Sequence, residues 1–144
     1  IHLSEKHVFS IHFIIMNKRI ILAASLLGAL AVILGAFGAH GLEGKVSAYH
    51  IETWKTANQY HFYHTFALLF LSTFSRAKTY SIKVSFIAFI VGILFFSGSL
   101  YILSIREITG FGNPAILGPI TPLGGLSLII GWIALFVAAL KNKS

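Results

Sequence analysis

The sequence predicts an all-α integral membrane protein, a bundle of four transmembrane helices with both termini in the cytoplasm. Hydrophobic residues make up 56% of the 144 residues and charged residues only 10%, with a mean hydropathy of +0.84, whereas soluble domains carry roughly 25% charged residues. The hydrophobic residues gather in long runs, and the basic residues lie between those runs. A chain of this length forms one domain, so we expect a single unit with short connections.

The chain begins with a stretch that precedes its single methionine, Met16. We interpret residues 1–15 as an upstream extension and residues 16–144 as the four-helix domain. A run of 20 residues ending at Ala39 then contains no charge, and at 1.5 Å per residue such a run reaches about 30 Å, the thickness of a bilayer's hydrocarbon core. The first helix is therefore predicted near residues 20–40.

The three later helices differ in polarity. The second, near residues 54–74, is firmly apolar only in its second half, because its first half carries several polar residues. The third, near residues 82–105, and the fourth, near residues 122–141, are apolar runs flanked by basic residues. Thr121 and Pro122 suit the N-cap and the first helical position, so we expect the fourth helix to begin there.

The basic residues indicate the orientation. With both termini inside, seven basic residues and no acid of residues 16–144 face the cytoplasm, while the other side has three basic residues that share their loops with glutamates. An excess of Lys and Arg in short loops marks the cytoplasmic side. The predicted cytoplasmic set is Lys18, Arg19, Arg76, Lys78, Lys83, Lys141 and Lys143. The expected partner is the lipid bilayer and not nucleic acid, because a nucleic-acid binder needs a basic stripe on one folded face.

Small residues recur in the first and fourth predicted helices. Ala31, Gly35 and Ala39 are spaced by four, and Gly38 adds to them, while Gly131 lies in the fourth helix. Small residues at this spacing let helix backbones approach closely in a membrane. We predict that Gly35 and Gly38 face another helix of the chain, with a homo-oligomer seam as the alternative.

Polar side chains gather at the outer ends of the first two predicted helices. Trp54, Asn58 and His61 follow i, i+4 and i+7 and share one stripe of a helix, with His64 beside them and His40 at the end of the preceding helix. Unpaired polar groups in hydrocarbon cost several kcal/mol, so these groups should face the bundle interior or a wet cavity. We predict an outward-opening ligand pocket formed by His40, Trp54, Asn58, His61 and His64.

The chemistry of this pocket has several interpretations. The histidines could form a hydrogen-bonded network at the membrane interface, or a proton site, because histidine titrates near neutral pH. Two imidazoles could also ligate zinc or haem iron, with His40, Glu43 or Glu52 completing the set. We favour the network and expect neither metal nor cofactor, because the spacing fixes no third strong ligand.

The composition argues against an enzyme. The chain has no aspartate and no cysteine, and its four glutamates lie outside the apolar runs. Intramembrane carboxylate and thiolate catalysis are thereby excluded. The Ser97-Gly98-Ser99 segment is similar to the serine region of intramembrane proteases, but Ser and Gly are common at helix interfaces, so we interpret it as packing and predict no catalytic residue.

Four motifs occur in a distinctive order along the chain. They are Gly35–Leu42, Trp54–Tyr60 with His64, Phe96–Tyr101, and Ile120–Gly125 with Gly131–Trp132. Together they resemble domain-of-unknown-function family 423, the YgdD and transmembrane protein 256-like membrane proteins, from about Met16 to the C-terminus. The resemblance implies a multi-pass protein of four helices in the bacterial inner membrane, and it implies no activity.

Three functions fit these features. The first is a non-enzymatic membrane protein whose polar pocket binds a small ligand or a proton. The second is an accessory or assembly subunit of a larger membrane complex, and the third is a metal- or haem-binding membrane protein. Four helices enclose little space unless they oligomerise, and no inverted repeat is visible, which argues against a transporter.

Overall fold

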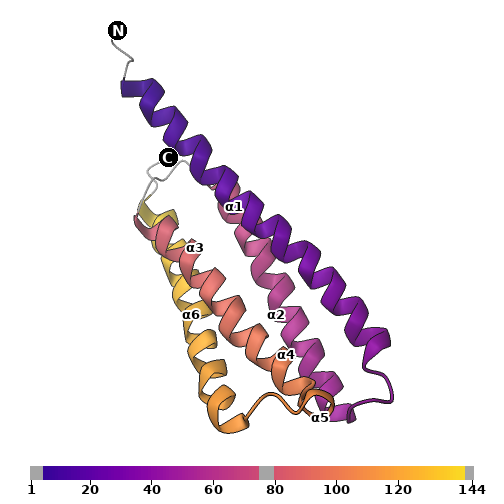
Figure 1. Cartoon of the computed structure of the whole chain (residues 1–144). Helices are drawn as coiled ribbons and strands as arrows, with labels where there is room; N and C mark the ends of the chain where they lie inside the picture. Colours follow the sequence, from indigo (N-terminus) through magenta and orange to yellow (C-terminus); the bar gives the residue numbers. More distant parts are fainter. Residues whose placement is uncertain (1–4, 75–79, 142–144) are drawn as a thin grey trace.

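The long helices of the chain lie side by side, with the start of α1 and the end of α6 at one end and α5 at the other (Figure 1). The computed structural model describes residues 5–74 and 80–141, with side chains from residue 18 onward within those ranges, and every regular element in them is helical. The elements are α1 (Glu5–Ala36), the π-helical turn η1 (Phe37–Gly41), α2 (Ala48–Thr73), α3 (Tyr80–Gly92), the π-helical turn η2 (Ile93–Ser97), α4 (Gly98–Ser104), α5 (Arg106–Thr109) and α6 (Pro114–Lys141).

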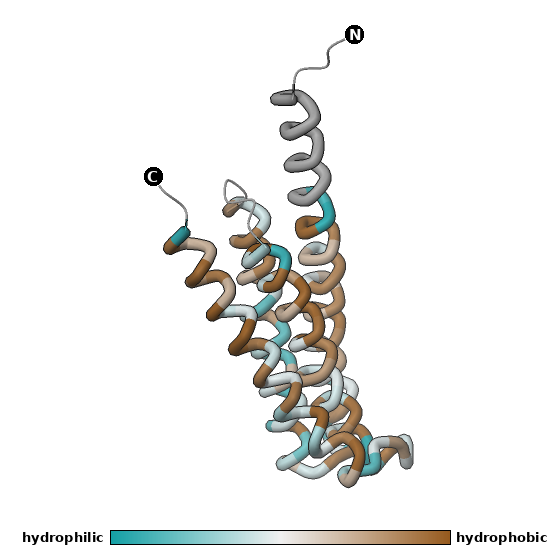
Figure 2. Tube along the Cα trace, turned by 90° about the vertical axis from the view of Figure 1, so that its left-hand side faces the viewer, coloured by the Kyte–Doolittle hydropathy of each residue, from teal (hydrophilic) through white to brown (hydrophobic). Residues whose placement is uncertain are grey.

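Three helical segments of the described chain are long and apolar enough to cross a membrane. They are Lys18–Gly41, Tyr80–Ser104 and Pro114–Lys141, with mean hydropathies of 2.6, 2.4 and 2.3. Figure 2 shows that α6 and the coloured part of α1 are largely hydrophobic. The all-helical fold with three candidate membrane-spanning segments is therefore confirmed. A fourth crossing by α2, whose first half is polar, stays a prediction.

The second helix begins at Ala48, six residues before the predicted start at residue 54. Ser47 has an extended backbone, and its hydroxyl accepts a hydrogen bond from the His50 N–H at 3.4 Å. A serine in this position satisfies one of the N–H groups that the first turn of a helix leaves without a partner. The polar N-terminal half of α2 is therefore six residues longer than predicted.

The prediction that the fourth helix begins at Thr121 and Pro122 is wrong. The helix α6 begins at Pro114, and the Asn113 side chain accepts a hydrogen bond from a first-turn N–H at 2.9 Å. Proline suits this position because its missing N–H would have had no partner there. Pro119 and Pro122 lie inside α6, where each removes one backbone hydrogen bond. The pattern of an N-cap residue followed by proline therefore marks the helix start at Asn113–Pro114 and not at the similar pair Thr121–Pro122.

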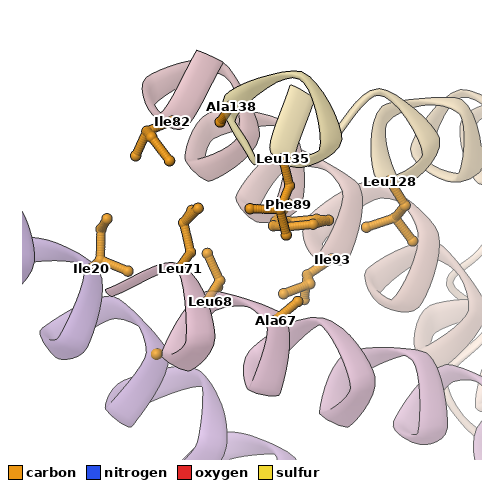
Figure 3. Packing of buried hydrophobic residues seen from close by; sticks show 11 residues of the cluster. Ile20, Ala67, Leu68, Leu71, Ile82, Phe89, Ile93, Leu128, Leu135 and Ala138 are labelled. Carbon is orange, nitrogen blue, oxygen red and sulfur yellow. The ribbon is translucent and has the colours of Figure 1, made fainter. Parts of the chain in front are cut away.

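The hydrophobic core joins α1, α2, α3 and α6 (Figure 3). Phe89 of α3 is fully buried between Leu68 and Leu71 of α2 and Leu128 and Leu135 of α6 in one cluster. Because lipid is as apolar as these side chains, close packing and not transfer from water holds such helices together in a membrane.

Glycines bring α6 against the helix formed by α3 and η2. A Cβ added at Gly124 would lie 2.7 Å from the carbonyl carbon of Phe95, and one added at Gly131 would lie 2.6 Å from the Phe89 ring. The Ser85 hydroxyl donates a hydrogen bond to the Gly131 carbonyl at 2.9 Å. The prediction that small residues of the fourth helix lie at a helix interface is confirmed for these two glycines.

Candidate functional site: the polar face of α2

The inward polar residues of α2 bond to the backbone of α1. Trp54 Nε1 donates to the Leu34 carbonyl at 2.8 Å, and Asn58 Nδ2 donates to the Ala31 carbonyl at 2.8 Å. The two helices are antiparallel, so one turn forward on α2 corresponds to about one turn back on α1. A carbonyl inside a helix has a second lone pair, which lets it accept these bonds without losing its own helical bond.

The small residues of α1 make this approach possible. A Cβ at Gly38 would collide with the Trp54 indole, and one at Gly35 would lie 3.1 Å from Asn58 Oδ1. The Thr65 methyl group lies 3.5 Å from where a Cβ at Gly28 would be. The prediction that Gly35 and Gly38 face another helix is confirmed.

Tyr101 of α4 joins the same cluster from the other side. Its hydroxyl oxygen lies 3.0 Å from Asn58 Nδ2 and 3.3 Å from His61 Nδ1, and its ring centroid is 4.5 Å from that of Trp54. Asn58 therefore donates one amide hydrogen to α1 and the other to α4. This one side chain of α2 therefore connects α2 to both α1 and α4.

The His61 ring is buried, with 2% exposure, and its Nε2 has no hydrogen-bond partner among the described residues. The Leu27 carbonyl of α1 lies near the ring, but without hydrogen-bond geometry. If the Tyr101 hydroxyl gives its single proton to Nδ1, the hydrogen of the neutral ring is on Nε2. The structure thus leaves one buried polar atom of the cluster unsatisfied.

His64 belongs to a second cluster, between α2 and α6. Its Nδ1 lies 2.7 Å from the Tyr60 carbonyl, and its Nε2 accepts a hydrogen bond from Trp132 Nε1 at 3.2 Å. A carbonyl can only accept, so Nδ1 carries the hydrogen and Nε2 presents its lone pair to the indole. Both nitrogens of the neutral ring are satisfied, and the ring also packs 5.6 Å from that of Phe89.

The structure brings together three of the five predicted pocket residues. Trp54, Asn58 and His61 meet at Tyr101, whereas His64 faces α6 and His40 is exposed on η1. Residues three apart differ by about 60° around a helix axis, which separates His61 from His64. The wider π-helical turn changes the direction of the residues that follow it, and His40 lies within that turn. Ligand binding by the five residues stays a prediction.

The sequence did not predict three residues that connect helices at this end of the bundle, namely His50, Glu107 and Tyr101. His50 is buried, and its Nδ1 lies 2.8 Å from Glu107 Oε1 and 3.0 Å from the Ser47 hydroxyl. The Ser47 N–H also donates to Glu107 Oε2 at 3.2 Å. Glu107 of α5 therefore caps the start of α2, and because Glu107 and Ser47 are 60 residues apart, no local sequence pattern predicts this contact. Tyr101 was missed as well, although it is the one tyrosine inside the third apolar run.

Potential ligand sites elsewhere are few in the described part of the chain. No group of three or more His, Cys, Asp or Glu there could hold a metal ion. An apolar depression of about 640 Å³ lies where α4 leads through α5 to α6, and its lining includes Ile102, Ile105, Phe111 and Leu117. None of the predicted pocket residues lines this depression.

Similarity to known proteins shows which family the chain belongs to. The family model described as "Protein of unknown function (DUF423)" matches residues 34–125. A UPF0382 membrane protein of Staphylococcus aureus is 44% identical over 126 residues, which cover 86% of this chain and 97% of the relative. The UPF0382 membrane protein YwdK of Bacillus subtilis is 46% identical over 127 residues, covering 86% of this chain and 98% of the relative. No solved structure matches. The ordered motifs and these relatives agree, and the chain belongs to the DUF423 family of small membrane proteins.

Proposed function

We propose that the chain crosses the bacterial inner membrane four times, with α2 as the fourth span. The 26 residues of α2 reach about 39 Å at 1.5 Å per residue, enough to cross the hydrocarbon core. The low hydropathy of α2 argues against a span where its polar groups face lipid, and the inward-facing groups do not. Trp54, Asn58, His64 and Thr65 instead bond to protein atoms, which offsets the cost of several kcal/mol for an unpaired polar group in hydrocarbon.

The charges support an orientation with both termini in the cytoplasm. From residue 18 onward, the described basic residues at one end of the bundle are Lys18, Arg19, Lys83 and Lys141, and no glutamate lies among them. The basic residues of the other end, Lys45, Lys55 and Arg106, share their segments with Glu43, Glu52 and Glu107. Arg76, Lys78 and Lys143 of the predicted set lie outside the described residues. The Lys and Arg bias of short loops sets the topology, and it favours the first end inside.

In function, the chain is a non-enzymatic accessory or assembly subunit of a membrane complex. One observation carries this proposal: α2 has polar side chains on the side that its own bundle does not cover. We call the row Glu52, Lys55, Gln59, Tyr63 and Phe66 the open face of α2. All five are exposed, and among the described hydrogen bonds of α2 side chains none involves Gln59.

The inward polar groups of α2 form hydrogen bonds to other helices of the same chain, so their role is in helix packing. The open face has no such role within one chain. Polar residues inside membrane spans are expensive and generally face protein or water. A protein partner that covers this face would supply the missing contacts. A chain that binds a membrane partner through such a face acts as an assembly subunit.

Photo-crosslinking in living cells tests this function. Tyr63 and Phe136 are both exposed aromatic residues, at 53% and 64%, on α2 and α6, so p-benzoylphenylalanine can replace either with little change in shape. We expect the probe at residue 63 to give protein adducts and the matched probe at residue 136 to give lipid adducts. Lipid adducts alone from both positions would refute the assembly function.

A small-ligand or proton site is the second candidate, and two buried atoms favour it. His61 Nε2 and the Ser97 hydroxyl have no hydrogen-bond partner among the described residues, and the residues that carry them are only 2% and 1% exposed. A buried polar atom without a partner costs about 1 to 3 kcal/mol, so a bound water or small polar ligand that pairs with it would be stabilising. If His61 takes up a proton, His61→Gln will remove a pH dependence of thermal stability that His40→Gln retains. Identical pH profiles for wild type and His61→Gln would end this candidate.

A further inference from the structure

We propose that the open face of α2 binds the open face of a second copy of this chain, about a two-fold axis perpendicular to the membrane. This inference rests on the proposed assembly function and names its partner. In such a dimer the same surface of both copies meets, so each residue on the axis meets its own counterpart and the surface must complement itself.

The depth of Gln59 shows why the open face needs a partner. Asn58 donates to the carbonyl of Ala31, so the two residues lie at the same level of the bundle. Ala31 lies near the middle of the candidate span Lys18–Gly41, within about one helical turn, or roughly 5 Å, of its midpoint. Gln59 follows Asn58 directly and is exposed, which places an uncovered amide near the centre of the hydrocarbon.

The amide of Gln59 complements itself. A carboxamide offers two N–H donors and a carbonyl acceptor, so two Gln59 side chains across a two-fold axis can each donate to the other. Asn and Gln side chains hydrogen-bond between helices in membranes in this way. Lipid tails offer neither donor nor acceptor and cannot take this role.

The charges at the outer end of the open face are paired within each copy. Lys55 Nζ lies 2.6 Å from Glu52 Oε1, and both side chains are largely exposed, at 63% and 70%. About an axis perpendicular to the membrane, the two copies of each residue lie at the same depth, so one helical turn separates Lys55 from the Glu52 of the second copy. Each ion pair therefore stays within its own chain, and these two residues bring no net charge to the dimer interface.

The open face continues as a straight stripe toward the other end of the helix. Gln59, Tyr63, Phe66 and Phe70 are spaced by four, three and four residues, which keeps them on one side of an α-helix. The aromatic members are 53%, 60% and 56% exposed. The inward side of α2 bonds or packs to α1, α4 and α6, so another helix can reach the stripe from the lipid side.

Disulfide crosslinking of single-cysteine variants in native membranes tests the dimer. The chain has no cysteine, so every crosslink comes from the introduced residue. We expect oxidation of Gln59→Cys and Tyr63→Cys to give a species of twice 15.8 kDa, because cysteines facing each other across the axis come within the roughly 7 Å Cα separation that a disulfide needs. Ile129→Cys, 56% exposed on α6 near the middle of its span, is the control and should stay monomeric.

A second variant measures the contribution of the amide. In mild detergent, Gln59→Leu should weaken self-association about fivefold or more, corresponding to roughly 1 kcal/mol for an interhelical hydrogen bond, while Ile129→Leu should not change it. Monomers from both Gln59→Cys and Tyr63→Cys would overturn the dimer. If the photoprobe at residue 63 then captures a different protein, the assembly function is supported and the dimer is refuted. If it captures only lipid, the assembly function and the dimer are both refuted.

Discussion

At the scale of single residues, the polar side chains of α2 connect helices. Asn58 donates to a backbone carbonyl of α1 and to the Tyr101 hydroxyl of α4, and Trp54 donates to a second carbonyl of α1. His64 accepts from Trp132 of α6. In the proposed four-span arrangement, each bond satisfies a group that would otherwise be unpaired in hydrocarbon, where water cannot replace the partner.

Asn58→Ala should lower the free energy of unfolding by about 1 to 3 kcal/mol, because it removes two interhelical hydrogen bonds and leaves the Tyr101 hydroxyl short of a donor. Thermal denaturation in detergent measures the change. Thr56→Ala is the control, since that exposed hydroxyl bonds only to the Glu52 carbonyl of its own helix. Equal melting temperatures for Asn58→Ala and wild type would contradict the role of Asn58 as a connection between helices.

Tyr101→Phe keeps the ring against Trp54 and removes only the hydroxyl between Asn58 and His61. We expect it to be destabilising by about 1 kcal/mol. Its effect should also be smaller in an Asn58→Ala background, because the two residues share one bond and their changes in stability are not additive. Strict additivity in this double-mutant cycle would mean that the bond contributes nothing.

At the scale of helices, the chain pairs its segments through small residues. Gly35 and Gly38 admit the side chains of α2, and Gly124 admits the backbone of η2. Overpacking a close contact of this kind is destabilising, because the neighbouring helix must move away.

The glycines of α6 offer a matched test of this packing. Gly124→Ala should be destabilising by about 1 to 3 kcal/mol, because the new methyl group meets the backbone of Phe95 and Phe96. Gly125→Ala, in the same helix with the Phe96 ring at an ordinary contact distance of 3.6 Å from the added Cβ, should be neutral or slightly stabilising, because alanine restricts the unfolded chain more than glycine does. Equal melting temperatures for the two variants would contradict the packing of α6 on η2.

The sequence predicted the parts of this arrangement that follow from local spacing. The stripe of Trp54, Asn58 and His61 follows from helical periodicity, and its members do face inward together. Tyr101 could not be assigned to them, because helix pairing depends on the tertiary fold. The start of α6 was missed because Asn113–Pro114 and Thr121–Pro122 satisfy the same local rule, and the bundle tolerates the later proline inside a helix.

At the scale of the whole molecule, the central question is whether the polar helix α2 crosses the membrane. Three other segments qualify by length and hydropathy alone. The antiparallel pairing of α2 with α1 favours a fourth crossing, since α1 is one of those three and Asn58 is level with its middle. A surface-lying α2 could not keep the bonds of Trp54 and Asn58 to successive turns of α1.

Single-cysteine labelling on either side of α2 measures this most directly. Lys45→Cys lies before α2 and Tyr80→Cys after it, and both native side chains are exposed. With a membrane-impermeant maleimide on intact cells whose outer surface has been made accessible, we predict labelling of residue 45 alone, and labelling of residue 80 only after the membrane is opened. Labelling of both residues from the same side would show that α2 does not cross, and would contradict the four-span account.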